Sequence, residues 1–192
     1  MRESVGRIIE TLRSVRKQKK IFLFLIAFFF FIDGVYTIID MATAYGSALG
    51  LNSTGLLLAL LVTQFVAFPF SILFGRLAEK YDTGKLILTC IAAYTGITVF
   101  AVFMKAQWQF WVLAIFVGMF QGGIQALSRS YFAKIVPPER SGEYFGLMDI
   151  CGKGASFMGT TVVGLASQAF GSINIGISAI VFLFLAGALF FM

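Results

Sequence analysis

The sequence has 192 residues, of which 59% are apolar and only 12% are charged. Water-soluble domains contain about half apolar and about a quarter charged residues, so this composition excludes an ordinary soluble fold. The net charge of +6 would favour nucleic acid as a partner for a soluble protein. Here the basic residues lie between long apolar runs, so we predict no nucleic-acid binding and take the lipid bilayer as the surroundings of the chain.

Residues 1–20 form a basic leader ahead of the first apolar run. Apolar residues at helical spacing alternate in it with seven basic ones, which are Arg2, Arg7, Arg13, Arg16, Lys17, Lys19 and Lys20. This pattern is typical of an amphipathic helix on a membrane surface. Such a leader either fixes the near end of the first span in the cytoplasm or binds a partner. We divide the chain into this leader and a membrane domain at residues 21–192.

Six apolar runs follow, and each approaches or exceeds the roughly 20 residues that cross a bilayer. They cover residues 21–45, 54–78, 86–104, 108–128, 144–168 and 173–192. Runs of this length satisfy their backbone polar groups in lipid as helices, so we predict an all-α membrane fold of six transmembrane helices. Ser53 or Thr54 is expected to cap the second helix. Pro137 and Pro138 prevent a continuous helix between the fourth and fifth spans.

The basic residues alternate from one connection to the next. All but two of the 15 Lys and Arg residues fall in the leader, the second-to-third connection or the fourth-to-fifth connection. The exceptions are Lys105, in the third-to-fourth connection, and Lys153, inside a span. This distribution predicts that both termini of the segment are cytoplasmic. We expect an integral protein of a bacterial cytoplasmic membrane.

Four ionisable side chains fall inside the spans: Asp33, Asp40, Asp149 and Lys153. Each costs about 2.5–3.5 kcal/mol at the centre of a membrane helix, so each needs a partner or a wet cavity. Asp33 and Asp40 are seven residues apart and share a helix face. Asp149 and Lys153 have the spacing of an ion pair within one helix. The pair either holds helices together or contributes to a solute site, and Asp33 is the excess carboxylate that we expect to couple transport to an ion.

Two amides in the fourth span, Gln121 and Gln125, lie beside three glycines at positions 118, 122 and 123. Small residues allow helices to approach closely, and amides hydrogen-bond across such contacts. Packing and solute contact are equally open interpretations of the two amides. The third and sixth spans carry no charge except at their ends, so we expect them to face lipid while the other four line a polar space.

The residues of common catalytic and metal sites are missing from the sequence. It has no histidine, and its two cysteines lie inside apolar runs, where a disulfide is not expected. It also lacks a phosphate-binding glycine motif and a nucleophile with an evident base. We therefore predict no enzyme activity, no cofactor and no metal site.

Three segments resemble a known transporter family. Residues 75–85 are similar to the cytoplasmic motif of the major facilitator superfamily, with Glu79 and Lys80 in place of its usual Asp and Arg and Asp82 in place of a glycine. Residues 121–130 with 137–146, and residues 33–38, resemble the vacuole-effluxer-like branch of that superfamily. The similarity extends over essentially the whole chain and aligns it with the C-terminal half of such a transporter.

The resemblance implies a 3+3 helix repeat that forms one half of a facilitator fold, with a midplane solute site between the two halves. Its partners would be the N-terminal six-span half and a small polar solute, with amino-acid efflux and proton coupling as the specific version. The expected site residues are Asp33, Asp40, Gln121, Gln125, Asp149 and Lys153. The resemblance also implies a cytoplasmic gate at Gly75, Arg76, Glu79, Lys85 and Arg129.

Two other interpretations stay open at this stage. The chain could be a six-span module that binds a partner or lipid without transporting, or a six-span transporter that works as a homodimer. The module needs the basic leader and not the charges inside the spans, whereas a transporter needs those charges.

Overall fold

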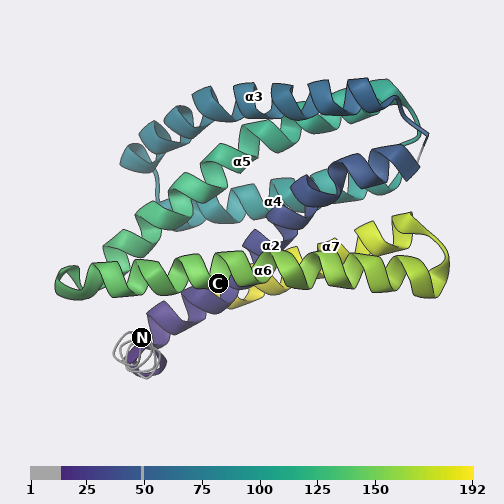
Figure 1. Ribbon diagram of the computed structural model, residues 1–192. Helices are drawn as coiled ribbons and strands as arrows, with labels where there is room; N and C mark the ends of the chain where they lie inside the picture. Colours follow the sequence, from purple (N-terminus) through teal and green to yellow (C-terminus); the bar gives the residue numbers. More distant parts are fainter. Residues whose placement is uncertain (1–13, 49) are drawn as a thin grey trace.

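The computed structural model describes residues 14–48 and 50–192, and this part of the chain is almost entirely helical (Figure 1). Its long helices are α2 (Lys19–Ala48), α3 (Ser53–Lys80), α4 (Thr83–Val102), α5 (Gln107–Ile135), α6 (Ser141–Phe170) and α7 (Ile173–Phe191). A short 3-10 helix, η1 (Pro138–Arg140), comes before α6. The predicted all-α fold is confirmed.

Most of the predicted leader, residues 1–13, lies outside the described residues. Residues 14–17 are helical, and α2 begins at Lys19. The last two leader residues therefore belong to the first long helix, which begins two residues before the expected span at 21–45.

Five of the long helices, α2, α3, α4, α5 and α7, are long and apolar enough to cross a membrane. Helix α6 has 30 residues, which is also enough length. It is less apolar than the others because Asp149, Lys153 and several Gly, Ser and Thr residues interrupt its hydrophobic stretches. Length and composition thus give five candidate crossings among residues 14–48 and 50–192, and a crossing by α6 stays a prediction.

The ends of the helices follow local side-chain chemistry. Asn52, rather than the expected Ser53 or Thr54, caps α3, and its side-chain oxygen accepts a hydrogen bond from the Gly55 amide at 3.1 Å. The prediction was one or two residues late because Asn is as good a cap as Ser and has the required extended backbone here. Helix α5 ends at Ile135, directly before the Val136–Pro137 segment, as the two prolines predict.

The helices form two packed groups, α3 with α5 and α2 with α6 and α7, and α4 packs against both. Helix α3 lies along α5, while α2 packs against α6 and α7, and α4 contacts both α5 and α7. In Figure 1 the α3–α4 connection and η1 lie at the end of the bundle where α2 begins. The connections after α2, α4 and α6 lie at the opposite end. The basic connections therefore share one end, as the charge alternation predicts.

Glycines set the distance between α3 and α5. A Cβ atom on Gly118 would meet the carbonyl oxygen of Thr63, and one on Gly122 would meet that of Ala67. The Thr63 hydroxyl also donates to the carbonyl oxygen of Ala114 across the same contact, at 3.2 Å. This glycine seam, as we call the contact of α3 with α5 at these residues, confirms that the small residues of the fourth span allow close helix packing.

The segment before α2 is tied to the first turn of α6. The Tyr144 hydroxyl accepts a hydrogen bond from Gln18 Nε2 at 2.9 Å and lies 3.3 Å from the Ser14 hydroxyl oxygen. Tyr144 itself is fully buried. The start of α6 and the start of the described chain are thereby joined by side chains across the basic end of the bundle.

Candidate functional site

A polar cavity of about 120 Å³ lies between α2, α5 and α6. Its walls combine apolar residues with charged, amide and hydroxyl groups. The lining residues are Phe28, Ile32, Tyr36, Gln125, Arg129, Met148, Asp149, Gly152 and Lys153. No residue of α4 or α7 is among them. The expectation that the third and sixth spans face lipid stays a prediction. Helix α3 also contributes none to this cavity, so the expectation that the second span lines a polar space stays a prediction.

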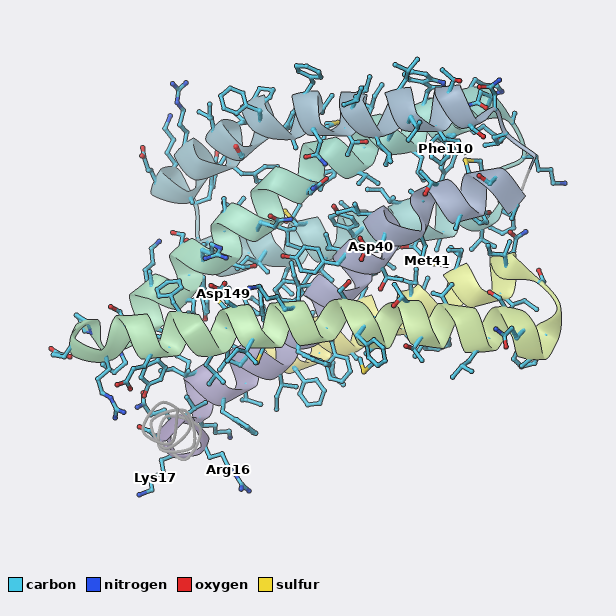
Figure 2. All side chains as sticks on the ribbon, viewed as in Figure 1. Arg16, Lys17, Asp40, Met41, Phe110 and Asp149 are labelled. Atoms are coloured by element: carbon cyan, nitrogen blue, oxygen red, sulfur yellow. The ribbon has the colours of Figure 1, made fainter. Side chains whose placement is uncertain are left out.

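Arg129 and Asp149 form a salt bridge across the cavity wall, with 2.8 Å between the guanidinium nitrogen and the carboxylate oxygen. Asp149 lies on the side of α6 that faces α5 (Figure 2). The side chains of Arg129 and Asp149 are 59% and 47% exposed. The expected pair of Asp149 with Lys153 is therefore wrong. A guanidinium from the neighbouring helix forms a short charge-assisted bond with the carboxylate, and the lysine one turn away does not displace it.

Lys153 lines the cavity one helical turn from the salt bridge and is exposed. Within the described part of the chain it forms no salt bridge. Gln125 and the Tyr36 ring come from the two other helices of the cavity. The cavity thus holds two cations, one carboxylate and two neutral polar groups, and its ionisable groups carry a net charge of plus one.

Asp33 is fully buried at the contact between α2 and α6, and it is not among the residues that line the cavity. Its Oδ1 accepts a hydrogen bond from the Gly159 amide at 2.8 Å and a long one from the Thr37 hydroxyl at 3.4 Å. Its Oδ2 is buried and has no hydrogen-bond partner. A Cβ atom on Gly159 would clash with both Thr37 and Asp33. The carboxyl group is enclosed but only half satisfied.

Asp40 also contacts α6, where it accepts a hydrogen bond from the Ser156 hydroxyl at 2.7 Å. It is exposed, in contrast to Asp33. The prediction that both carboxylates share one face of the first span is confirmed, since both bind α6. We call this contact of α2 with α6, formed by Asp33, Thr37, Asp40, Ser156 and Gly159, the polar seam.

The two predicted amides of α5 have different surroundings. Gln125 lines the cavity, whereas the Oε1 atom of Gln121 is buried and has no hydrogen-bond partner. The structure therefore brings together three of the six residues expected at the solute site, Gln125, Asp149 and Lys153, and adds Arg129 from the predicted gate. Asp33, Asp40 and Gln121 lie outside the cavity.

The remaining predicted gate residues lie at the basic end of the bundle. Gly75, Arg76 and Glu79 are exposed near the end of α3, and Lys85 is exposed in the first turn of α4. Among residues 14–48 and 50–192, neither Arg76 nor Glu79 forms a salt bridge. The gate role stays a prediction for these four residues.

The connection between α3 and α4 contains two interactions that the motif comparison did not reveal. Asp82 caps α4 by accepting a hydrogen bond from the Lys85 amide at 2.9 Å. Lys134 donates to the Thr83 hydroxyl at 2.9 Å and so joins the end of α5 to the start of α4. An Asp three residues before a helical amide is a recognisable cap signal, so the first of these could have been found from the sequence.

Sequence reasoning also missed Gly159 and Ser156 as the partners of the two α2 carboxylates. The spacing of Gly152, Ser156 and Gly159 puts small residues on one face of α6, which is a signal for close helix approach. The described residues contain no cluster of three His, Cys, Asp or Glu side chains that could hold a metal ion. Cys90 and Cys151 are both free thiols, as their positions predict.

Comparison with known proteins places this arrangement in a family. The family model described as "Vacuole effluxer Atg22 like" matches residues 1–192. The chain belongs to the Atg22-like vacuole effluxer family. This confirms the resemblance stated from the sequence, and the transporters of this family are typically not enzymes.

The chain is similar to a bacterial transporter and to fungal autophagy-related proteins. It is 46% identical over 184 residues to the uncharacterized MFS-type transporter YxiO of Bacillus subtilis, and the alignment covers 96% of the chain and 43% of that protein. It is 29% identical to autophagy-related protein 22 of Saccharomyces cerevisiae, over 84% of the chain and 33% of that protein. It is 26% identical to the Cryptococcus neoformans protein of the same name, over 90% of the chain and 34% of that protein. The chain thus spans less than half the length of these relatives.

Proposed function

We propose that the chain forms the C-terminal six-helix half of a secondary transporter that works by alternating access, with α6 as the sixth membrane crossing. The observation that carries this proposal is the polar cavity between α2, α5 and α6. Charged groups that line a cavity among membrane helices mark a solute or ion path, because they are costly anywhere else in the bilayer. Family membership and the greater length of the relatives support the assignment to one half of a facilitator fold.

The solute proposed for this cavity is a small polar molecule with charges of both signs, such as an amino acid. The Asp149 carboxylate can accept hydrogen bonds from the ammonium group of the solute. Lys153 can pair with the carboxylate of the solute without first breaking a protein salt bridge. Gln125 and Tyr36 add hydrogen-bonding groups from the other two helices. The description of the family as effluxers supports outward movement.

The Arg129–Asp149 salt bridge is proposed as a movable contact between α5 and α6 in the cytoplasmic gate. Its two side chains are half exposed, so water replaces the bond at little cost when the helices separate. The exposed group at Gly75, Arg76, Glu79 and Lys85 would meet the N-terminal half of the transporter, which is the proposed protein partner.

Asp33 is proposed as the coupling group. It is enclosed by α2 and α6, and one of its oxygens lacks a partner, which suits a carboxyl group that takes up and releases a proton as the two helices move. Since it lies at the seam and not in the cavity, it would couple through the position of α6 rather than by contact with solute.

The test is solute flux in liposomes that contain the full-length transporter, with an amino-acid mixture as the first probe. Lys153→Gln should abolish flux by removing a cation from the cavity. Asp33→Asn should leave binding in place and remove the dependence of flux on a pH gradient. Lys105→Gln is the matched control, because it removes a cation from the opposite end of the bundle, outside the cavity.

Unchanged flux in Lys153→Gln would contradict the cavity as a solute path. Unchanged coupling in Asp33→Asn would remove Asp33 from the mechanism and leave the cavity proposal standing. A protein whose function needs the leader at residues 1–20 and neither of these charges would instead be the non-transporting module.

A further inference from the structure

A second and larger cavity, of about 520 Å³, opens between the segment before α2, the first turns of α2, and α6. Its walls are apolar apart from one basic side chain at its end. The lining residues are Val15, Arg16, Phe22, Leu25, Ile26, Phe29, Phe30, Leu147 and Cys151. We call this cavity the α2–α6 groove.

The α2–α6 groove and the polar cavity have no residue in common and lie on different faces of the helices between them. On α6, Cys151 lines the groove and Asp149 lines the polar cavity. Two residues correspond to about 200° around a helix, so these side chains point in nearly opposite directions. The groove therefore opens away from the proposed solute path, on a side of the bundle where apolar side chains such as Phe22 are exposed.

Positive charge collects at one end of the groove. Arg16 lines it directly, and Lys17, Lys19 and Lys20 are exposed on the same short stretch of chain. Arg16 and Lys17 extend from the end of the bundle where α2 and α6 begin (Figure 2). The charge alternation assigns this end to the cytoplasmic side, where the membrane surface is rich in anionic lipid.

We propose that the α2–α6 groove binds an anionic phospholipid of the cytoplasmic leaflet. An acyl chain lies along the Phe22, Leu25 and Phe29 side of the groove, and the phosphate pairs with the Arg16 guanidinium. The size and apolar lining of the groove suit hydrocarbon, and a guanidinium suits a phosphate because it can donate two parallel hydrogen bonds to it. A basic group at the mouth of an apolar space between membrane helices, on the cytoplasmic side, is the arrangement that recognises such head groups.

Cys151 provides a direct probe of this occupancy, since it is partly buried and lines the groove. Cys90, the other thiol of the chain, is fully buried. The full-length protein is placed in nanodiscs of phosphatidylcholine alone or with phosphatidylglycerol, and N-ethylmaleimide labelling of the Cys151 peptide is followed by mass spectrometry. Phosphatidylglycerol should slow labelling about fivefold, the effect on lipid binding expected of one basic residue near an anionic surface.

Two neighbouring substitutions separate a lipid in the groove from a general effect of surface charge. Arg16→Gln should restore the labelling rate found in phosphatidylcholine, because it removes the phosphate partner. Lys17→Gln changes the net charge equally but lies outside the groove lining, so it should keep most of the protection. Both positions are exposed, so neither change should affect folding.

Equal labelling rates in the two lipid mixtures would overturn the proposal. Equal loss of protection in Arg16→Gln and Lys17→Gln would also overturn it, because that result indicates an effect of surface charge without a bound lipid. Slow labelling in both mixtures would also overturn it, because another part of the protein would then fill the groove. Native mass spectrometry gives a second readout. The wild type and Lys17→Gln should retain one more phosphatidylglycerol molecule than Arg16→Gln.

Discussion

The glycine seam between α3 and α5 and the polar seam between α2 and α6 hold their helices together by different means. In the glycine seam, Gly118 and Gly122 let backbone meet backbone, and the Thr63 hydroxyl has two carbonyl acceptors, those of Ala59 and Ala114. In the polar seam, Asp33 keeps one oxygen without a partner, and Asp40 forms its bond to Ser156 while exposed.

This difference indicates which helix pair moves. Close backbone packing has one best geometry, and it loses many small contacts when the helices shift. A seam of hydroxyl, carboxylate and amide groups can exchange partners, and water can replace the exposed ones. We therefore expect α3 and α5 to move as one unit and α6 to move relative to α2, which would change the walls of the polar cavity.

Gly122→Leu should have the largest effect on stability. Its Cβ would lie 2.5 Å from the Ala67 carbonyl oxygen, a backbone atom that cannot turn aside. The free energy of unfolding should fall by about 3 kcal/mol, at the upper end of overpacking effects. Thermal unfolding in detergent measures this. Gly164→Leu is the matched control, because a Cβ there has no atom within 4 Å. Equal melting temperatures for the two variants would mean that the glycine seam is not rigid.

Gly159→Ala should have an intermediate effect. The added methyl group would meet the Thr37 hydroxyl and the Asp33 carboxylate, which are side-chain groups that can rotate. We expect a loss of about 1–2 kcal/mol in the same unfolding assay. Adding Thr37→Ala should recover part of that loss by making room for the methyl group. A double variant less stable than Gly159→Ala alone would show that the polar seam does not adapt.

Arg129→Gln should have the smallest effect on stability. Both side chains of the Arg129–Asp149 pair are about half exposed, so the bond contributes about 0.5 kcal/mol or less. The melting temperature should stay within error of wild type, while amino-acid flux in liposomes falls because Asp149 loses its partner across the cavity. A large drop in melting temperature would identify the pair as a structural bond, and the proposed gate would then lose its support.

The helices could be predicted from the sequence because the bilayer imposes a strong and simple rule on chain length and polarity. All six apolar runs became helices, and the limits of each lie within a few residues of the expected ones except at the end of α5, which continues to Ile135. The extension is polar, with Arg129 and Lys134. A prediction from hydropathy therefore ended the helix where the apolar run ends. The helix continues because no residue before Pro137 prevents it.

The site was less predictable because it depends on which helices become neighbours. The shared face of Asp33 and Asp40 follows from helical periodicity alone. The burial of Asp33 does not, since Asp40 on the same face is exposed. The salt bridge of Asp149 does not, because a spacing of four residues suggests a partner on the same helix, whereas the actual partner, Arg129, lies on α5. The α6 partners of the two carboxylates are small residues whose role becomes visible only when α2 lies against them.

The hydrogen bonds of Tyr144 couple the position of the segment before α2 to that of α6. Tyr144 stands five residues before Asp149 on α6, and its hydroxyl binds the stretch of chain that leads into α2. A movement of that stretch therefore reaches the first turn of α6 and is transmitted along the helix to Asp149 and Lys153. A shift of the segment before α2 would therefore also shift the α6 wall of the polar cavity.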